Sequence, residues 1–192
     1  MAAMVMDKLK FCNFKLDILL SVTQSINNND SVSLLLKQYA GLLHNELNIP
    51  NVLLYSCEQS WQPLLASGIG ETLFDKISVE QDLFLFKTIS TTNYEKNAYL
   101  SQFDMIIPIF HKDNALAYLL IGDSAEHPGM SFSIKHLQFI QTVTNVILVA
   151  IENKRLAKEQ SKQEAFMVDL HLAARMQKLM IPEKKNLPNT DK

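Results

Sequence analysis

The feature that most constrains the fold of this chain is a helical pattern near its C-terminal end that no breaker interrupts. Ser131 or Ser133 can begin the helix, and no proline follows until Pro182. Counted from Ser133, 49 residues with a rise of 1.5 Å each would span about 73 Å. A domain built from a chain of 192 residues is much narrower than that. Only the first part of the helix can therefore lie on a core, and the rest must leave it.

The composition of this helix changes twice along its length. Residues 134–151 are apolar enough to be buried against a sheet, whereas residues 152–164 are strongly charged. Residues 165–181 again carry apolar side chains, spaced by alternating steps of four and three residues as in a coiled coil. The residues of this frame, which we call the seam, are Val149, Glu152, Leu156, Glu159, Gln163, Phe166, Leu170, Ala173, Gln177 and Met180.

The apolar members of the seam need a partner, because a lone helix with this much exposed apolar surface would tend to aggregate. Pairing with a second copy of the chain satisfies them. We therefore predict a parallel homodimer built from the helix at 14–27 and the helix that begins near Ser133. The residues that we expect to carry dimerisation and signalling are Val149, Leu156, Phe166, Leu170, Ala173 and Met180.

The remainder of the chain predicts an α+β domain with an antiparallel sheet. Apolar residues at helical spacing predict a helix over 14–27, and Asp30 or Ser31 can cap a second one over 31–48. Two hairpins follow from alternating apolar runs joined by turn residues. The first pairs 51–57 with 61–68, and the second pairs 105–111 with 115–123 through Lys112-Asp113-Asn114.

Two details of the strands are predicted separately. Pro108 has no N–H, so its strand should have an unpaired position or a bulge at that point. The stretch between the hairpins, residues 71–103, has a mixed pattern. Within it, residues 71–81 can form a short helix and residues 82–89 a strand.

Composition excludes several classes of function. The net charge of −2 argues against nonspecific nucleic-acid binding, which needs a basic patch. The sequence has no uncharged apolar run long enough to span a membrane, and lysines interrupt its apolar start, unlike a secretion signal. Cys12 and Cys57 lie far apart with no CxxC spacing. Free thiols in a reducing cytoplasm are therefore expected.

The domain resembles a GAF domain in its order of elements and in its C-terminal half. The resemblance rests on "MIIPIFHKDNALAYLLIGD" and "FSIKHLQFIQTVTNVILVAIEN", with Phe132-Ser133 at the start of the helix and Ala150 to Asn153 at its exit. It covers roughly residues 14–153. The resemblance implies a GAF-like antiparallel sheet flanked by N- and C-terminal helices, followed by a long C-terminal coiled-coil helix.

GAF domains bind ligands between one face of the sheet and a variable middle segment, which here is residues 71–103. The resemblance therefore implies a pocket between the sheet and this middle segment. Its aromatic residues can line a cavity for an unknown small molecule or fill it as core. The candidate pocket residues are Tyr55, Phe74, Phe84, Phe86, Tyr94, Tyr99, Phe103 and Ile107. The Asn-Lys-Phe-Asp-Glu signature of cyclic-nucleotide-binding GAF domains is absent, and neither cysteine falls in the middle segment as a chromophore attachment site would.

No catalytic or metal-binding motif is present in the sequence. The five histidines show no HxxxH or HExxH spacing, and Ser67-Gly68-Ile69-Gly70 is too sparse for a phosphate loop. Glu58 beside Cys57 disfavours a reactive thiolate there. We therefore expect no catalytic residue, no metal and no cofactor in this chain.

The segment "FMVDLHLAARMQKLMIP" carries a second resemblance. It is similar to the helix that precedes the catalytic domain in bacterial PPM-type (SpoIIE-like) serine phosphatases, which regulate sigma factors through partner switching. That helix has the form Leu-x-Leu-Ala-x-x-Ile-Gln-x-x-Leu-x-Pro, and Met176 replaces its isoleucine here. The matching residues are Leu170, Leu172, Ala173, Ala174, Gln177, Leu179 and Pro182.

The phosphatase resemblance implies that the helix leads to a catalytic domain beyond Lys192. We then expect an N-terminal extension at 1–13, a sensory domain at 14–153, a linker helix at 154–181 and a polar tail at 182–192. The expected partners are a second copy of the chain and its own phosphatase domain, with Mn²⁺ or Mg²⁺ only in that domain. Neither nucleic acid nor membrane is expected as a partner.

Two other interpretations stay open. The same sensor can serve another output, such as a histidine kinase or a cyclase, although no His-Glu pair of the kinase type follows the linker. The chain can also be a stand-alone dimerisation module or an enzyme on a related α+β scaffold.

Overall fold

The computed structural model describes residues 2–70, 73–92, 98–122 and 136–180. They divide into two units, residues 1–150 and 151–192. The long helix α3 (Leu137–Met180) belongs to both units. The first unit holds a sheet and the helices that pack on it, and the second is helical from Ile151 to Met180.

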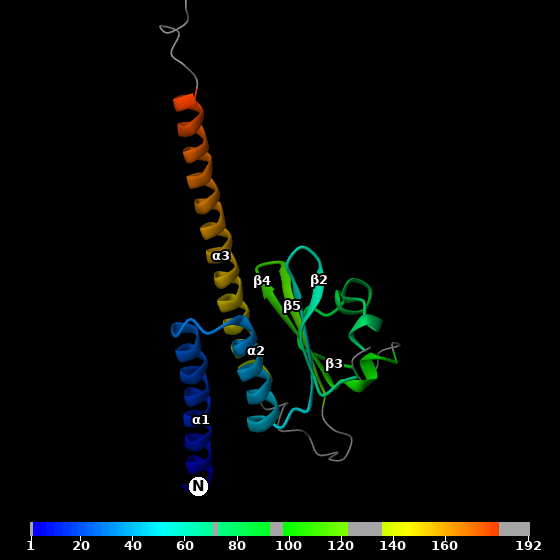
Figure 1. The fold of residues 1–192 in the computed structure, drawn as a ribbon. Coiled ribbons are helices and arrows are strands. Elements are labelled where there is room, and N and C mark those ends of the chain that lie inside the picture. Colours follow the sequence, from blue (N-terminus) through cyan, green and yellow to red (C-terminus); the bar gives the residue numbers. More distant parts are fainter. Residues whose placement is uncertain (1, 71–72, 93–97, 123–135, 181–192) are drawn as a thin grey trace, which may run out of the picture. The chain divides into compact units, whose positions relative to one another are not determined.

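The first unit is built on a five-stranded antiparallel sheet with the strand order β2-β1-β5-β4-β3 (Figure 1). Within the first unit, the helices lie on one side of this sheet, and residues 73–86 and 98–103 lie on the other. The strands are β1 (Asn51–Cys57), β2 (Trp61–Ser67), β3 (Ser90–Thr91), β4 (Met105–His111) and β5 (Asn114–Gly122). The predicted α+β class and antiparallel sheet are therefore confirmed.

Both predicted hairpins form. The turn of the second one is tight: His111 pairs with Asn114, and Lys112 has a φ of 55°. The predicted irregularity near Pro108 is present but lies after it, between Ile109 and Phe110. Pro108 itself pairs with Tyr118. Its missing N–H is tolerated because β3 pairs with β4 only at Met105 and Ile106, so β4 is an edge strand at Pro108.

The two N-terminal helices also form, with different bounds. Helix α1 (Ala2–Asn27) begins well before Phe14, because the preceding Ala, Met, Lys and Leu residues are good helix formers. Helix α2 (Val32–Gly41) begins after Ser31, whose side chain accepts the N–H of Leu34 at 3.2 Å. This confirms one of the two predicted caps. A π-helix at Leu42–Glu46 continues the segment.

The strand predicted over residues 82–89 is wrong. Residues Val79–Leu83 form one π-helical turn instead, and the short strand β3 begins only at Ser90. The Asp82 carboxylate accepts the N–H of Ser78 at 2.8 Å, and the N–H of Phe84 bonds to the carbonyl of Val79 at 3.1 Å. These local bonds satisfy backbone groups that a strand would have had to pair across a sheet.

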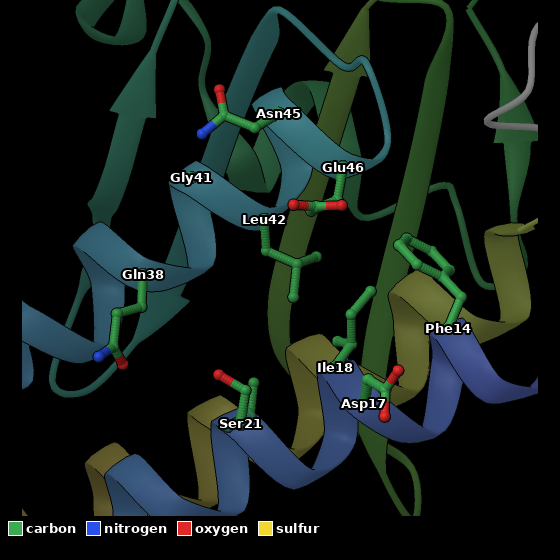
Figure 2. Close-up of a pocket in the computed structure, with 10 residues that line it drawn as sticks. Phe14, Asp17, Ile18, Ser21, Gln38, Gly41, Leu42, Asn45 and Glu46 are labelled. Atoms are coloured by element: carbon green, nitrogen blue, oxygen red, sulfur yellow. The ribbon is translucent and has the colours of Figure 1, made fainter.

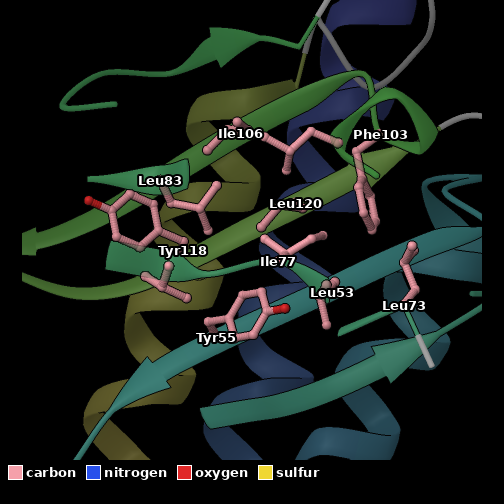
Figure 3. Packing of buried hydrophobic residues seen from close by; sticks show 11 residues of the cluster. Leu53, Tyr55, Leu73, Ile77, Leu83, Phe103, Ile106, Tyr118 and Leu120 are labelled. Atoms are coloured by element: carbon pink, nitrogen blue, oxygen red, sulfur yellow. The ribbon is translucent and has the colours of Figure 1, made fainter. Parts of the chain in front are cut away.

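A buried apolar cluster fills the space between the sheet and the middle segment (Figure 3). Strands β1, β4 and β5 contribute alternate residues to this face, and the middle segment contributes the rest. The buried members are Leu53, Tyr55, Leu73, Ile77, Val79, Leu83, Leu100, Phe103, Ile106, Tyr118 and Leu120.

The opposite face of the sheet packs against the helices of the first unit. The side chain of Gln141, on α3, donates a hydrogen bond to the carbonyl of Pro108 at 2.8 Å. Tyr39, on α2, is fully buried and its hydroxyl bonds to that of Thr144. Thr144 also donates to the carbonyl of Ile140 at 2.7 Å. Burial raises the pKa of Tyr39, so its hydroxyl stays protonated in the folded protein.

Tyr39→Phe is expected to lower the free energy of unfolding by about 1 kcal/mol, the usual contribution of one buried hydrogen bond. The loss should be modest because Thr144 keeps its own acceptor, the carbonyl of Ile140. Urea denaturation at neutral pH measures the change. Thr142→Ala is the control, since its exposed hydroxyl bonds only within α3 and its loss should cost much less. Equal losses in the two variants would contradict this account.

In the second unit, the described side chains are exposed apart from a few near its start. Arg155 bonds to two seam carboxylates of its own helix, Glu152 at 2.6 Å and Glu159 at 2.7 Å. The hydrogen bond from Arg155 lowers the pKa of Glu152.

Ser131 and Ser133, the two residues predicted to begin the long helix, lie outside the described residues. The helix is described from Leu137 onward. None of the described helices is long and apolar enough to cross a membrane.

Candidate functional site

The aromatic residues that the sequence placed in a pocket are largely part of the core. Tyr55 and Phe103 are buried, and Phe74 and Phe86 pack against the same cluster. The hydroxyl of Tyr55 donates to the carbonyl of Phe74 at 2.7 Å and ties the sheet to the middle segment. Burial and the nearby acidic side chains raise the pKa of Tyr55, so this bond keeps its proton.

The other predicted pocket residues are not brought together. Ile107 pairs with Leu119, whereas its neighbour Ile106 belongs to the cluster, so Ile107 lies on the helix-facing side of the sheet. Tyr99 is 38 % exposed, and the ammonium of Lys76 lies 5.1 Å from the centroid of its ring. Tyr94 lies outside the described residues. Phe84, 46 % exposed, lines an open cavity that is described next.

A cavity of about 460 Å³ opens beside the buried cluster, near the turns of both hairpins. Its volume lies within the range of small-molecule sites. Four of its nine lining residues are aromatic, and one basic and one acidic side chain are among the others. We call it the aromatic pocket, and it is lined by Cys57, Trp61, Phe84, Lys87, Phe110, Asp113, Asn114, Ala115 and Tyr118.

Four rings of the aromatic pocket form one connected group around Tyr118. The ring centroid of Tyr118 lies 5.5 Å from that of Trp61 and 6.5 Å from those of Phe84 and Phe110. Trp61 and Phe84 meet edge to face at 5.8 Å and an interplanar angle of 73°. These are favourable aromatic geometries. Burial raises the pKa of Tyr118, so its ring remains uncharged.

Trp61 also lines a second, smaller cavity of about 280 Å³ on the same face. Tyr55, Phe74 and the acidic residues Asp75 and Glu80 contribute to that cavity. Trp61 is thus a residue that the two cavities share. It is also the one tryptophan of the chain.

A third cavity, of about 490 Å³, lies between α1 and the α2 segment (Figure 2). Its apolar lining residues include Phe14, Ile18, Val22 and Leu42, and the carboxylates of Asp17 and Glu46 also line it. Among the described side chains, its lining includes no lysine, arginine or histidine. The groove joins two helices of the first unit and has no connection in sequence with the predicted pocket residues.

Neither cysteines nor histidines form a recognisable centre in the described structure. Cys12 and Cys57 are both free and exposed. Within the described residues, no group of three or more His, Cys, Asp or Glu side chains could hold a metal ion.

The seam residues that the sequence assigned to dimerisation are exposed wherever the structure describes their side chains. Val149 of the first unit is 47 % exposed. In the second unit Leu156, Phe166 and Leu170 are 49 %, 63 % and 48 % exposed, and Ala173 is exposed as well. The side chain of Met180 lies outside the described part.

No protein-family model matches the sequence, and no curated protein matches it either. Solved structures do match its fold. The GAF domain of a protein described as a sensor histidine kinase from Pseudomonas syringae pv. tomato aligns with a TM-score of 0.60 and 12% identity, over 83% of this chain and 99% of that one.

Two further GAF domains come from phosphoenolpyruvate-protein phosphotransferases. The one from Coxiella burnetii has a TM-score of 0.57 and 18% identity, over 76% of this chain and 96% of that one. The one from Acinetobacter has a TM-score of 0.56 and 14% identity, over 75% and 96%. Identities this low do not show that this chain shares the function of those proteins. The chain therefore has an α+β fold similar to that of these GAF domains, with a long C-terminal helix.

Proposed function

We propose that this chain is the sensory and dimerisation module of a bacterial PPM-type serine phosphatase, acting in the cytoplasm. The observation that carries the proposal is the segment from Leu170 to Pro182, whose pattern is similar to the helix that leads into such phosphatases. In this role the chain has no catalytic residues, and Mn²⁺ or Mg²⁺ would be bound only by the phosphatase domain. The substrate of the intact protein would be a phosphoserine protein, an anti-anti-sigma factor of the STAS type.

The arrangement of α3 supports a role in transmission. Its first part is packed into the first unit by Phe139, Ile140, Val143 and Ile147, which are all buried. Movement of the sheet or of the middle segment would therefore act on this part of the helix. The same helix continues into the second unit without a break, so a bias applied at one end can reach the other.

Homodimerisation is the second element of the proposal. Exposed apolar residues at coiled-coil spacing, above all Phe166 and Leu170, are stabilised when a second copy buries them. In a parallel pair the two outgoing helices end side by side. Such a pair can switch two downstream domains between two relative arrangements, and a regulatory linker must provide such a switch.

The alternative is a sensor for another output, such as a histidine kinase or a cyclase. The fold comparisons favour this interpretation equally, since GAF domains of a histidine kinase and of phosphotransferases have the same fold. What separates the two proposals is the sequence of the outgoing helix. A chain that feeds a kinase has no need of the Leu-x-Leu-Ala pattern.

An activity assay tests the phosphatase assignment. The isolated chain of residues 1–192 should not hydrolyse a phosphoserine protein with Mn²⁺ present, because the described residues hold no group of metal ligands. A protein that joins this chain to its downstream domain should dephosphorylate a phosphorylated STAS-type protein. The control is the same protein after chelation of the metal. Metal-dependent turnover by residues 1–192 alone, or ATP-dependent autophosphorylation of the intact protein in place of phosphatase activity, would overturn the assignment.

A further inference from the structure

Two β-bulges in the sheet determine which side chains line the aromatic pocket. Between β1 and β2 the partner of Leu54 is Leu65 and that of Tyr55 is Pro63, so Leu64 is an extra residue on β2. Strict alternation from Leu65 would send Trp61 to the helix-facing side of the sheet. The bulge at Leu64 reverses this and places Trp61, the partner of Cys57, on the side of Tyr55.

The second irregularity has the same effect on β5. Ile109 pairs with Ala117 and Phe110 pairs with Ala115, so Leu116 is the extra residue. The bulge turns the small side chain of Ala115 toward the aromatic side, opposite Phe110. A methyl group beside Phe110 leaves open space at the hairpin end that a larger side chain would fill. Bulges that re-aim side chains in this way are common beside functional sites.

Family resemblance predicts a cavity between the sheet and the middle segment, and only part of that space is open in the described structure. The space between the sheet and the middle segment is packed with buried apolar side chains, including Leu83, Phe103 and Ile106. The open volume lies next to it, where Trp61 and Phe84 are only partly covered.

We propose that the aromatic pocket binds a small, flat aromatic molecule and is the sensory site of the module. Faces and edges of Trp61, Phe84 and Phe110 offer the stacked and edge-to-face contacts that such a ring makes. Lys87, Asp113 and Asn114 supply hydrogen-bonding groups of both kinds. The lining carries one side chain of each charge, which favours a ligand without net charge. This inference rests on the proposed sensory function and adds the ligand class and its site.

The single tryptophan provides a direct measurement. In ¹⁵N-labelled protein of residues 1–192, Trp61 gives the one indole N–H signal, which unlabelled ligands do not obscure. The probe is 2-naphthol, a flat aromatic alcohol, and its saturated counterpart decahydro-2-naphthol has the same skeleton without the aromatic faces. We expect 2-naphthol to shift the Trp61 signal saturably. The saturated alcohol should bind about threefold to tenfold more weakly, the range expected for loss of an aromatic contact.

Two neighbouring substitutions locate the site. Phe84→Ala removes a ring of the pocket from a side chain that is 46 % exposed, so the fold should tolerate it. Leu85→Ala is the matched control, because Leu85 is 81 % exposed and does not line the cavity. Phe84→Ala should weaken 2-naphthol binding at least severalfold, whereas Leu85→Ala should leave it unchanged.

The outcomes are distinct. No saturable shift of Trp61, equal binding of the two alcohols, or undiminished binding by Phe84→Ala would each overturn the ligand class or the site. Failure here would leave the dimer and the phosphatase output intact, and these are measured separately. Conversely, if 2-naphthol binds at Trp61 but the intact protein has no phosphatase activity, the ligand site stands and the proposed function fails.

Discussion

Leu170→Asp is expected to convert a dimer of this chain into a monomer. In a parallel pair Leu170 faces its own counterpart, so the substitution places two carboxylates against each other in an apolar seam. An uncompensated charge in such a position costs on the order of 3–5 kcal/mol, which corresponds to a loss of affinity of about a hundredfold or more. Leu170 is 48 % exposed in the single chain, so it is not a core residue of either unit. The fold of the domain should therefore survive.

Light scattering at tens of micromolar measures the result. The unmodified chain should have twice the 21.8 kDa chain mass, and Leu170→Asp should approach the mass of one chain. The matched control is His171→Asp, which introduces the same carboxylate one residue later and outside the seam. It should remain dimeric. A monomeric unmodified chain, or a Leu170→Asp variant as dimeric as the control, would remove the basis for signalling through paired helices.

The hairpins could be predicted from sequence because local chemistry determines them. Lys112 and Asp113 form a tight turn between two apolar runs, and the turn fixes which residues pair. The same holds for the cap at Ser31, where a single side chain satisfies a backbone N–H. In each case the deciding contact lies within a few residues of sequence.

The middle segment could not be predicted in the same way. Leu83 and Leu85 suggest the alternation of a strand, yet Leu83 is fully buried and Leu85 is 81 % exposed. The deciding interaction is the hydrogen bond that the N–H of Ser78 donates to Asp82, which closes a helical turn. An apolar pattern cannot show that bond. Short apolar runs are compatible with both structures until a side chain settles the backbone.

The sequence did not show which of the predicted pocket residues share a face of the sheet. Alternation alone does not say which of Ile106 and Ile107 faces the middle segment, and the structure places Ile106 there. Trp61 was missed because the bulge at Leu64 changes the side of the sheet that it faces. Phe110 lies on the same face as Ile106 by simple alternation along β4, so its strand could have indicated it. A bulge depends on pairing between strands, and a single strand's sequence carries no clear sign of it.

The charged stretch 152–164 gives the seam a weak middle, and the ion pairs of Arg155 explain how it is tolerated. Glu152 and Glu159 both belong to the seam, where each would face its own counterpart in a parallel dimer. Arg155 of the same helix contacts both carboxylates and offsets part of that repulsion. Exposed pairs of this kind contribute little to stability. In the proposed dimer the stretch would therefore allow two arrangements that differ by about a few kcal/mol, as a switch requires.

Replacing Glu152, Glu159 and Gln163 together with Leu is expected to lock the output of the intact protein. Three apolar residues would continue the seam through its weak middle, so one arrangement of the paired helices should become strongly favoured. The ratio of phosphatase rates with and without the activating signal should then fall toward one. The control replaces Lys158, Ser161 and Glu164 with Leu, which adds the same side chains outside the seam. If the seam variant kept the full regulatory ratio of the unmodified protein, residues 152–164 would be a passive tether and the signal would have to travel by another route.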